Sequence, residues 1–233
     1  MNWLQKLSWR FEGTPNPWAA SAARYRPGDA PPEVEMLPSG EVYYPIYQDP
    51  DYPFVFLGGA DKYEFAMAEK MAGRPIKDRV SLALRTDEDL PGREILNVPI
   101  EEIPIFDVQP GQVTDPQAKK AIESFKMAVN VLANIIHHRA QLPPEKQEPI
   151  YIHCNLGQNR SPAVLAAVLA ALKGKPVDDV LKDIASQRSL IRPSDFNYWL
   201  ASGADPQIAD ELDLGYSGYR SEDPESSPKP PFS

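Results

Sequence analysis

The middle of the chain alternates between short apolar runs and longer segments in which apolar residues recur every three or four positions. Short runs bounded by glycine, proline or polar residues are typical of buried strands, whereas the longer spacing is typical of helices with one buried face. We expect strands at 52–57, 79–84, 94–99 and 148–153 and helices at 60–72, 116–138, 161–172, 177–187 and 195–201. This alternation predicts an α/β fold, a three-layer sandwich whose mostly parallel central sheet is flanked by helices.

Two of the expected helices have distinguishing features. The segment 161–172 is built almost entirely of alanine, leucine and valine without charge, so we expect it to be central and buried. The segment 116–138 begins at Pro116, a residue favoured in the first turn of a helix. Thr114 or Asp115 precedes it, and either side chain is of a type that caps a helix.

The two ends of the chain differ from the middle in composition. Residues 1–53 hold 9 of the 26 prolines, which is typical of extended chain, yet several tryptophans in this arm indicate that it packs partly on the body. Within the arm, 41–47 has strand-like composition and 49–51 resembles a turn. Residues 204–233 are acidic and rich in proline and serine, so we expect a largely disordered tail. The folded domain is then expected at 54–203.

Charge and composition disfavour several classes of protein. The formal net charge of −9 disfavours an extended nucleic-acid-binding face. Most of the negative charge lies at the ends, since the net charge is −3 in 1–53 and −5 in 201–233 but −1 between them. A local positive site in the middle is therefore compatible with the acidic net charge of the whole chain. No apolar run reaches the ~18 residues that a membrane-spanning helix needs, and residues 1–11 do not resemble a secretory signal. The single cysteine excludes an internal disulfide, and we expect a cytoplasmic monomer.

The candidate chemistry lies in one segment, Tyr151-Ile152-His153-Cys154-Asn155-Leu156-Gly157-Gln158-Asn159-Arg160-Ser161-Pro162. An apolar strand leads into Cys154, five residues follow, and a helix begins near Arg160. Free backbone N–H groups and the helix dipole favour an anion at such a position. The amides of the five intervening residues can surround one phosphate, helped by the conformational freedom of Gly157. The planar guanidinium of Arg160 can hold two phosphate oxygens.

The same groups are expected to lower the pKa of the Cys154 thiol, because helix N-termini and cations stabilise a thiolate. Cys154 then becomes a nucleophile beneath a bound phosphoryl group. Ser161 is placed to donate a hydrogen bond to the sulfur, and we expect His153 to orient the loop through the backbone rather than to act as a base. The alternative is that Cys154 is a small buried hydrophobic residue, as a lone cysteine usually is. Arg192 either supports this loop or bridges to an acidic residue on the body.

This segment resembles the signature His-Cys-x5-Arg-Ser/Thr of the cysteine-based protein tyrosine phosphatases. Roughly 54–200 is similar to the small dual-specificity branch of that superfamily. Three further stretches carry the resemblance, namely Phe56-Leu57-Gly58-Gly59-Ala60, Asn97-Val98-Pro99-Ile100 and Ser189-Leu190-Ile191-Arg192-Pro193-Ser194-Asp195-Phe196. The resemblance implies a phosphomonoester hydrolase of the protein-tyrosine or dual-specificity type, which forms a cysteinyl-phosphate intermediate and uses no metal or other cofactor.

The resemblance also implies a general acid on a loop before the long helix. It protonates the leaving oxygen and then serves as base for the attacking water. Asp107, about 9 residues before the helix, is our first choice. Glu102 is an alternative because it follows a Pro-Ile pair similar to the family's acid loop, and Asp115 is a third candidate that competes with its capping role.

The sequence leaves the substrate class open. The expected partner is a phosphorylated protein or a small phosphoester. A phosphoinositide, a nucleotide or an RNA 5′-phosphate is the alternative, although the loop between Cys154 and Arg160 contains no lysine, which favours the first group. Two alternatives from other classes are a non-catalytic phosphate-binding module and an interaction protein that acts through its ends. Arg85, Thr86 and Asp87, at the expected end of a strand, are further candidates for substrate contact.

Overall fold

The computed structural model describes residues 35–36, 42–43, 45–83, 90–100 and 116–202. Its strands are β1 (Glu35–Met36), β2 (Val42–Tyr43), β3 (Tyr47–Gln48), β4 (Val55–Gly58), β5 (Asp78–Ser81), β6 (Arg93–Asn97) and β7 (Ile150–His153). Its helices are α3 (Lys62–Ala72), α4 (Pro116–Ala140), the 3-10 helix η2 (Pro144–Lys146), α5 (Arg160–Lys173), α6 (Val177–Gln187) and α7 (Asp195–Ser202).

The main sheet has five strands in the order β3-β4-β7-β5-β6. β7 lies at the centre and pairs in parallel with β4 and β5, β5 pairs in parallel with β6, and β3 is antiparallel to β4 at one edge. β1 and β2 form a separate antiparallel pair. The mostly parallel sheet predicted from the alternation of elements is therefore confirmed.

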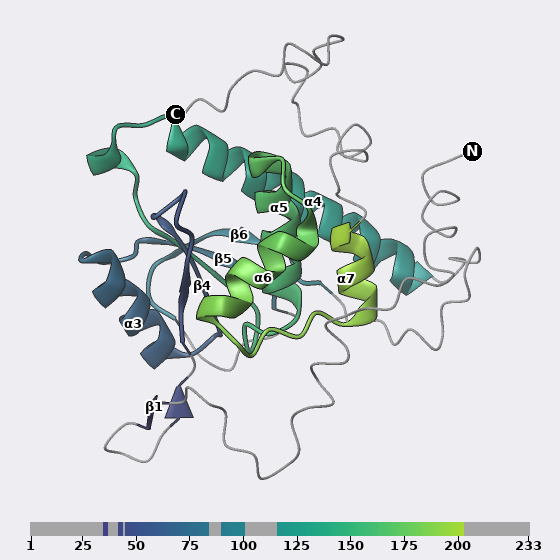
Figure 1. Cartoon of the computed structure of the whole chain (residues 1–233), viewed down its shortest axis with the longest axis horizontal. Helices are drawn as coiled ribbons and strands as arrows, with labels where there is room; N and C mark the ends of the chain where they lie inside the picture. Colours follow the sequence, from purple (N-terminus) through teal and green to yellow (C-terminus); the bar gives the residue numbers. More distant parts are fainter. Residues whose placement is uncertain (1–34, 37–41, 44, 84–89, 101–115, 203–233) are drawn as a thin grey trace.

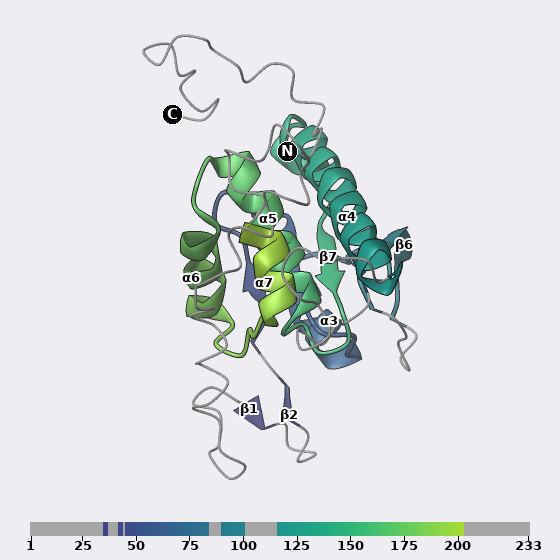
Figure 2. The same cartoon turned by 90° about the vertical axis from the view of Figure 1, so that its right-hand side faces the viewer.

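Helices cover both faces of this sheet. α3 lies on one face, and α4, α5, α6 and α7 lie on the other (Figure 1, Figure 2). Alternate side chains of β4 and β7 pack against the helices on the two faces, because successive side chains of a strand point to opposite faces of the sheet. Phe56 and Tyr151 pack with Phe65 of α3, whereas Leu57 and Ile152 pack with the larger group of helices. This arrangement confirms the predicted three-layer sandwich.

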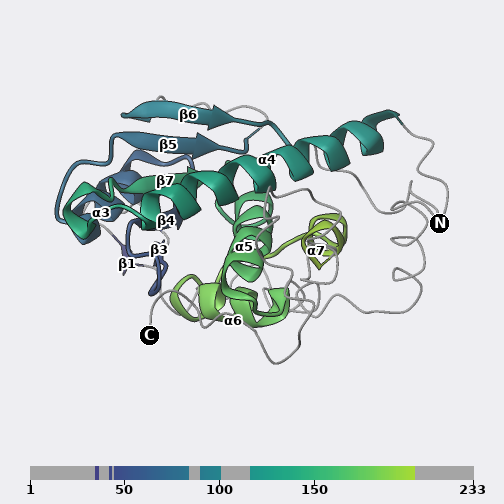
Figure 3. The ribbon, with the colours of Figure 1, turned by 90° about the horizontal axis from the view of Figure 1, so that it is seen from above.

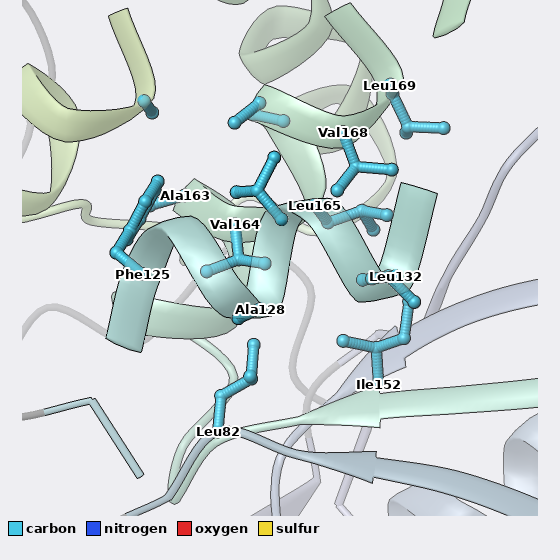
Figure 4. Packing of buried hydrophobic residues seen from close by; sticks show 14 of the residues in the cluster. Leu82, Phe125, Ala128, Leu132, Ile152, Ala163, Val164, Leu165, Val168 and Leu169 are labelled. Carbon is cyan, nitrogen blue, oxygen red and sulfur yellow. The ribbon is translucent and has the colours of Figure 1, made fainter. Parts of the chain in front are cut away.

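α5 is the central helix of the larger layer. Its residues from Arg160 to Ala170 are all buried, as expected from the lack of charge in this segment. α4 packs against α5, and the two helices cross in the view of Figure 3. Figure 4 shows part of the core of this layer, with Phe125, Ala128 and Leu132 of α4, Ala163, Val164, Leu165, Val168 and Leu169 of α5, Leu82 just after β5, and Ile152 of β7. Burying each such leucine or valine stabilises the fold by about 1.5–3 kcal/mol, so packing holds α5 firmly in place.

Most elements lie within a few residues of their expected positions, but the strand expected at 41–47 is wrong. It is replaced by β2 and β3, which belong to different sheets. Pro45 lies between them, has no amide hydrogen to give to a ladder, and uses its carbonyl to accept a hydrogen bond from Arg188. The described residues 45–53 form β3 and the turn that leads to β4. Residues 1–34 and 203–233 lie outside the described part of the chain, so the domain boundaries stay predictions.

Candidate active site

The candidate loop connects the central strand to the central helix. β7 ends at His153 and α5 begins at Arg160, so residues 154–159 form what we call the β7–α5 loop. It lies at the carboxyl end of parallel strands, where open α/β sheets place their ligand sites. The side chains of His153 and Cys154 point to opposite faces of the sheet, because they are successive residues of an extended chain. His153 stacks on Tyr151 on the α3 side, whereas Cys154 packs with the α4–α7 layer.

The Cys154 side chain is held beneath the start of α5. Only 2% of the residue is exposed, and its sulfur accepts a hydrogen bond from Ser161 Oγ at 3.2 Å. Burial acts to raise the pKa of this thiol, but the hydroxyl and amide of Ser161, the charge of Arg160 and the amide of Asn159 outweigh it. The pKa of Cys154 therefore lies below the ordinary thiol value, which favours the nucleophilic thiolate.

Four successive carbonyl groups of the β7–α5 loop are bonded to donors outside it. The pairs are Asn155 O with Ala60 N (2.7 Å), Leu156 O with Arg188 Nη2 (2.8 Å), Gly157 O with Arg188 Nε (3.0 Å) and Gln158 O with Arg192 N (2.5 Å). The described residues contain no cis peptide bond, and in a trans peptide the N–H points opposite to the C=O. The amides of residues 156–159 therefore point away from these donors, toward the side where Asn159 N bonds the sulfur of Cys154. Such a run of amides is an anion-binding arrangement.

Glycine is the one residue type that the loop geometry tolerates at position 157. Its φ of 62° lies in the left-handed region, which side chains disfavour. A Cβ there would overlap the carbonyl group of Gly58 at the end of β4 and come within 2.7 Å of Arg188 Nη2. The close approach of the loop backbone to β4 thus depends on the missing side chain.

Arg160 supplies the positive charge of the site from the first residue of α5. It is 8% exposed, and its Nη1 donates to the carbonyl of Ile100 at 3.4 Å. This contact holds the side chain beside the loop, and the charge contributes to the lowered pKa of Cys154. A guanidinium at this position offers parallel N–H groups to an oxyanion bound by the loop amides.

Asn159 joins the loop to the segment before α7. It occupies the position before α5, but its side chain makes no capping bond to that helix. Instead, its Oδ1 accepts hydrogen bonds from Ser194 N at 2.7 Å and from Asn197 Nδ2 at 2.8 Å. The 189–196 stretch that carries part of the sequence resemblance therefore lies against the loop.

His153 is buried under the loop and is uncharged near neutral pH. Burial, with the charge of Arg79 in the same direction, lowers the pKa of His153 to about 4 despite its contact with the Cys154 carbonyl. Its Nδ1 lies 3.3 Å from that carbonyl oxygen. A neutral ring in this position can orient the backbone at Cys154 and has no charge to add to the site.

The outer rim of the loop differs from its interior. The side chains of Asn155 and Leu156 are exposed, Leu156 by 60%, and Gln158 is partly exposed. The described part of the rim thus offers an apolar and an amide surface and no cation. Asp107, Glu102, Asp115 and Arg85–Asp87, the other predicted candidates, lie outside the described residues.

Two charged residues that support this loop could not be identified from the sequence pattern. Arg188 and Glu64 form a buried ion pair at 3.1 Å, and Arg188 bonds two of the loop carbonyls. In the sequence, Arg188 follows an amphipathic helix and Glu64 lies in the first turn of another, where charged side chains are normally solvated. No local signal distinguishes them.

The described residues hold no group of three histidine, cysteine, aspartate or glutamate side chains that could bind a metal ion. No helix among them is long and apolar enough to cross a membrane.

Several solved structures are similar to the chain. Those of DUSP15 and of the Cydia pomonella PTP-2 phosphatase are each 18% identical to it with a TM-score of 0.47. The first match covers 72% of this chain and 94% of that one, and the second covers 69% and 89%. A mouse putative dual specificity phosphatase complexed with zinc tungstate is 14% identical with a TM-score of 0.48, and the match covers 81% of this chain and 96% of that one. No family model and no curated protein sequence matches the chain.

Proposed function

We propose that this chain is a cysteine-dependent phosphomonoester hydrolase of the protein-tyrosine or dual-specificity type. One observation carries the proposal: four consecutive carbonyls of the β7–α5 loop accept hydrogen bonds from donors outside the loop. The N–H groups of the same peptides therefore point to the side on which the Cys154 thiol lies, and the pKa of that thiol is lowered. Arg160 adds a guanidinium to the same site. Together these groups match what a phosphoryl dianion and an attacking sulfur require.

In the first step, the Cys154 thiolate attacks phosphorus. The S–P bond forms as the bond from phosphorus to the ester oxygen breaks, and the general acid gives its proton to that oxygen. The loop amides and Arg160 stabilise the charge on the three equatorial oxygens in the transition state. We assign the acid role to Asp107, with Glu102 and Asp115 as the alternatives.

In the second step, a water molecule attacks the phosphocysteine. The S–P bond breaks, the water's proton passes to the carboxylate left by the first step, and inorganic phosphate is released. The departing sulfur leaves as a thiolate, which the hydroxyl of Ser161 stabilises from 3.2 Å. The two steps together require only the phosphate ester, one water molecule and the residues named above.

The direct test replaces the nucleophile. Cys154→Ser should abolish hydrolysis of an aryl phosphate, while inorganic phosphate still binds because the amides and Arg160 remain. Ser186→Ala, on the exposed side of α6 and bonded only locally, serves as the control and should keep full activity. Turnover by the Cys154→Ser variant would overturn the mechanism, and a wild-type protein that binds phosphate without hydrolysing any ester would favour the non-catalytic phosphate-binding module.

The acid is identified by its dependence on the leaving group. The residue that protonates the ester oxygen matters more for phenyl phosphate, a poor leaving group, than for p-nitrophenyl phosphate. Asp107→Asn should therefore slow the first substrate more than the second, whereas Glu102→Gln and Asp115→Asn should slow both equally or neither. If one of the latter pair shows the selective loss, the acid role moves to that residue.

The loop rim favours a phosphoprotein or a small neutral phosphoester as substrate. It presents Leu156 and amide side chains, and no lysine lies between Cys154 and Arg160 to pair with a second phosphate. A panel of phosphopeptides, inositol phosphates, nucleotides and RNA with 5′-phosphates tests this assignment. A higher kcat/KM for a polyphosphorylated substrate than for a phosphopeptide would overturn it.

A further inference from the structure

Arg188 is a fully buried charge whose contacts converge on the β7–α5 loop. It follows α6, is 0% exposed, and donates to the carbonyls of Leu156 at 2.8 Å and Gly157 at 3.0 Å. Its Nη1 donates to Pro45 O at 2.6 Å and lies 3.1 Å from Glu64 Oε2. One rigid guanidinium thus determines the orientation of two successive peptide planes, which the flexible ammonium of a lysine would not reproduce.

Glu64 connects this arginine to the remaining support of the loop. The residue is 3% exposed, and Oε2, the atom that faces Arg188, also accepts a hydrogen bond from Gly59 N at 2.6 Å. Gly59 is followed by Ala60, whose amide bonds Asn155 O. Glu64 therefore reaches the carbonyls of residues 155, 156 and 157, two of them through Arg188 and one through the Gly59–Ala60 turn.

The pair also joins the two helical layers. Glu64 belongs to α3 and Arg188 follows α6, and these helices lie on opposite sides of β4 (Figure 1). A buried ion pair is a weak device for stability, because apolar residues of the same volume often stabilise a fold as well. What apolar residues would not do is orient carbonyl groups. The position of the pair behind the loop therefore indicates a role in shaping the loop.

We propose that Glu64 and Arg188 are positioning residues for oxyanion binding. They turn the carbonyls of Leu156 and Gly157 outward, so that the amides of Gly157 and Gln158 face the bound oxyanion, and neither side chain contacts the substrate. This inference rests on the proposed function only in taking the loop to be an oxyanion site, and it is tested without turnover.

Glu64→Gln is the diagnostic variant because the loss of its charge and the loss of its positioning role would change oxyanion affinity and the pKa of Cys154 in opposite directions. The loss of one negative charge would, acting through space, strengthen oxyanion binding and lower the pKa of Cys154. The loss of positioning would weaken oxyanion binding and raise the pKa of Cys154. Glutamine keeps the volume of the side chain and an oxygen that can accept from Gly59, so the variant preserves most of the packing.

Two measurements on the full chain decide the matter. The dissociation constants of vanadate and inorganic phosphate are measured by quenching of intrinsic fluorescence or by calorimetry. The pKa of Cys154, which is the single cysteine, is measured from the pH dependence of its alkylation by iodoacetamide. For Glu64→Gln and Arg188→Lys we expect oxyanion affinity at least about tenfold weaker, as for the loss of one or two hydrogen bonds, and an alkylation midpoint at higher pH.

Lys173→Met is the matched control. Lys173 forms a second buried ion pair with Asp49 at 2.8 Å, at the far end of α5 from the loop. This variant should lose stability in urea without any change in oxyanion affinity or alkylation midpoint. If Glu64→Gln and Arg188→Lys behave like this control, or if Glu64→Gln strengthens oxyanion binding, the positioning role is overturned. A wild-type protein without turnover whose variants still show the expected shifts would refute the proposed function and leave the positioning role supported.

Discussion

The hydroxyl of Ser161, in the first turn of α5, donates a hydrogen bond across 3.2 Å to the sulfur of Cys154, the first residue after β7. Ser161 is fully buried, so its hydroxyl is held there by the packing of α5. A hydrogen bond to a thiolate is stronger than one to a thiol, which makes this contact a stabiliser of sulfur both as nucleophile and as leaving group.

Ser161→Ala should slow the breakdown of the phosphocysteine more than its formation. The loss of a charge-assisted hydrogen bond of about 1.5–3 kcal/mol corresponds to a step slower by roughly 10- to 160-fold. Rapid-quench kinetics with p-nitrophenyl phosphate would show a burst of nitrophenol followed by a slow steady state, and the pKa of Cys154 would rise. A uniform loss in both phases would place the role of Ser161 in folding alone.

Gly157→Ala should disrupt both the fold and the loop. The left-handed backbone alone costs about 1–2 kcal/mol for a residue with a Cβ, and the overlap with the Gly58 carbonyl adds to it. Gly174→Ala is the matched control, since its φ is also 62° but nothing lies within 4 Å of the added Cβ. Urea unfolding should show a larger loss for Gly157→Ala, and only that variant should lose phosphate binding; equal losses would refute the steric argument.

His153 should make the fold less stable in acid. Its pKa is about 4 in the folded protein and near 6.5 when unfolded, so the unfolded chain binds more protons as the pH falls. The contribution of the neutral ring is fully present above pH ~6.5 and is lost as the pH falls toward 4, to a total of about 3 kcal/mol. The free energy of unfolding measured between these pH values should decline more steeply for the wild type than for His153→Gln. Parallel curves would contradict the buried, neutral state of the ring.

Lys173→Met should destabilise the fold without touching the candidate site. Lys173 bonds both carboxylate oxygens of the fully buried Asp49, which also accepts from Tyr47. Removing the Lys173 ammonium leaves the Asp49 carboxylate buried without its cation, which typically lowers the free energy of unfolding by about 3–5 kcal/mol. Urea denaturation measures the loss. Lys173 ends a helix whose 14 residues span about 20 Å, so kcat/KM of the folded variant should equal that of the wild type. A loss below about 1 kcal/mol would mean that the pair contributes little.

The elements were predictable because their signals are local. α6 has the bounds 177–187 expected from its periodic apolar residues, and the uncharged segment 161–172 is the buried helix α5. The order of residues around Cys154 likewise indicated a strand, a loop and a helix, and β7 and α5 flank the loop as expected. Local composition failed at 41–47, where Pro45 separates two strands and donates no ladder bond.

The sequence by itself therefore determined the alternation of strands and helices and the position of Cys154, Arg160 and Ser161 at one strand–helix junction, because each depends on residues that are neighbours in the chain. Only the tertiary structure decided which groups orient the loop between them. Arg188 meets the loop carbonyls from 31 and 32 residues away, and Glu64 reaches it from the opposite face of the sheet. A charged residue buried by such long-range contacts has the same local sequence pattern as a solvated one, so burial and partner emerge only when the chain has folded.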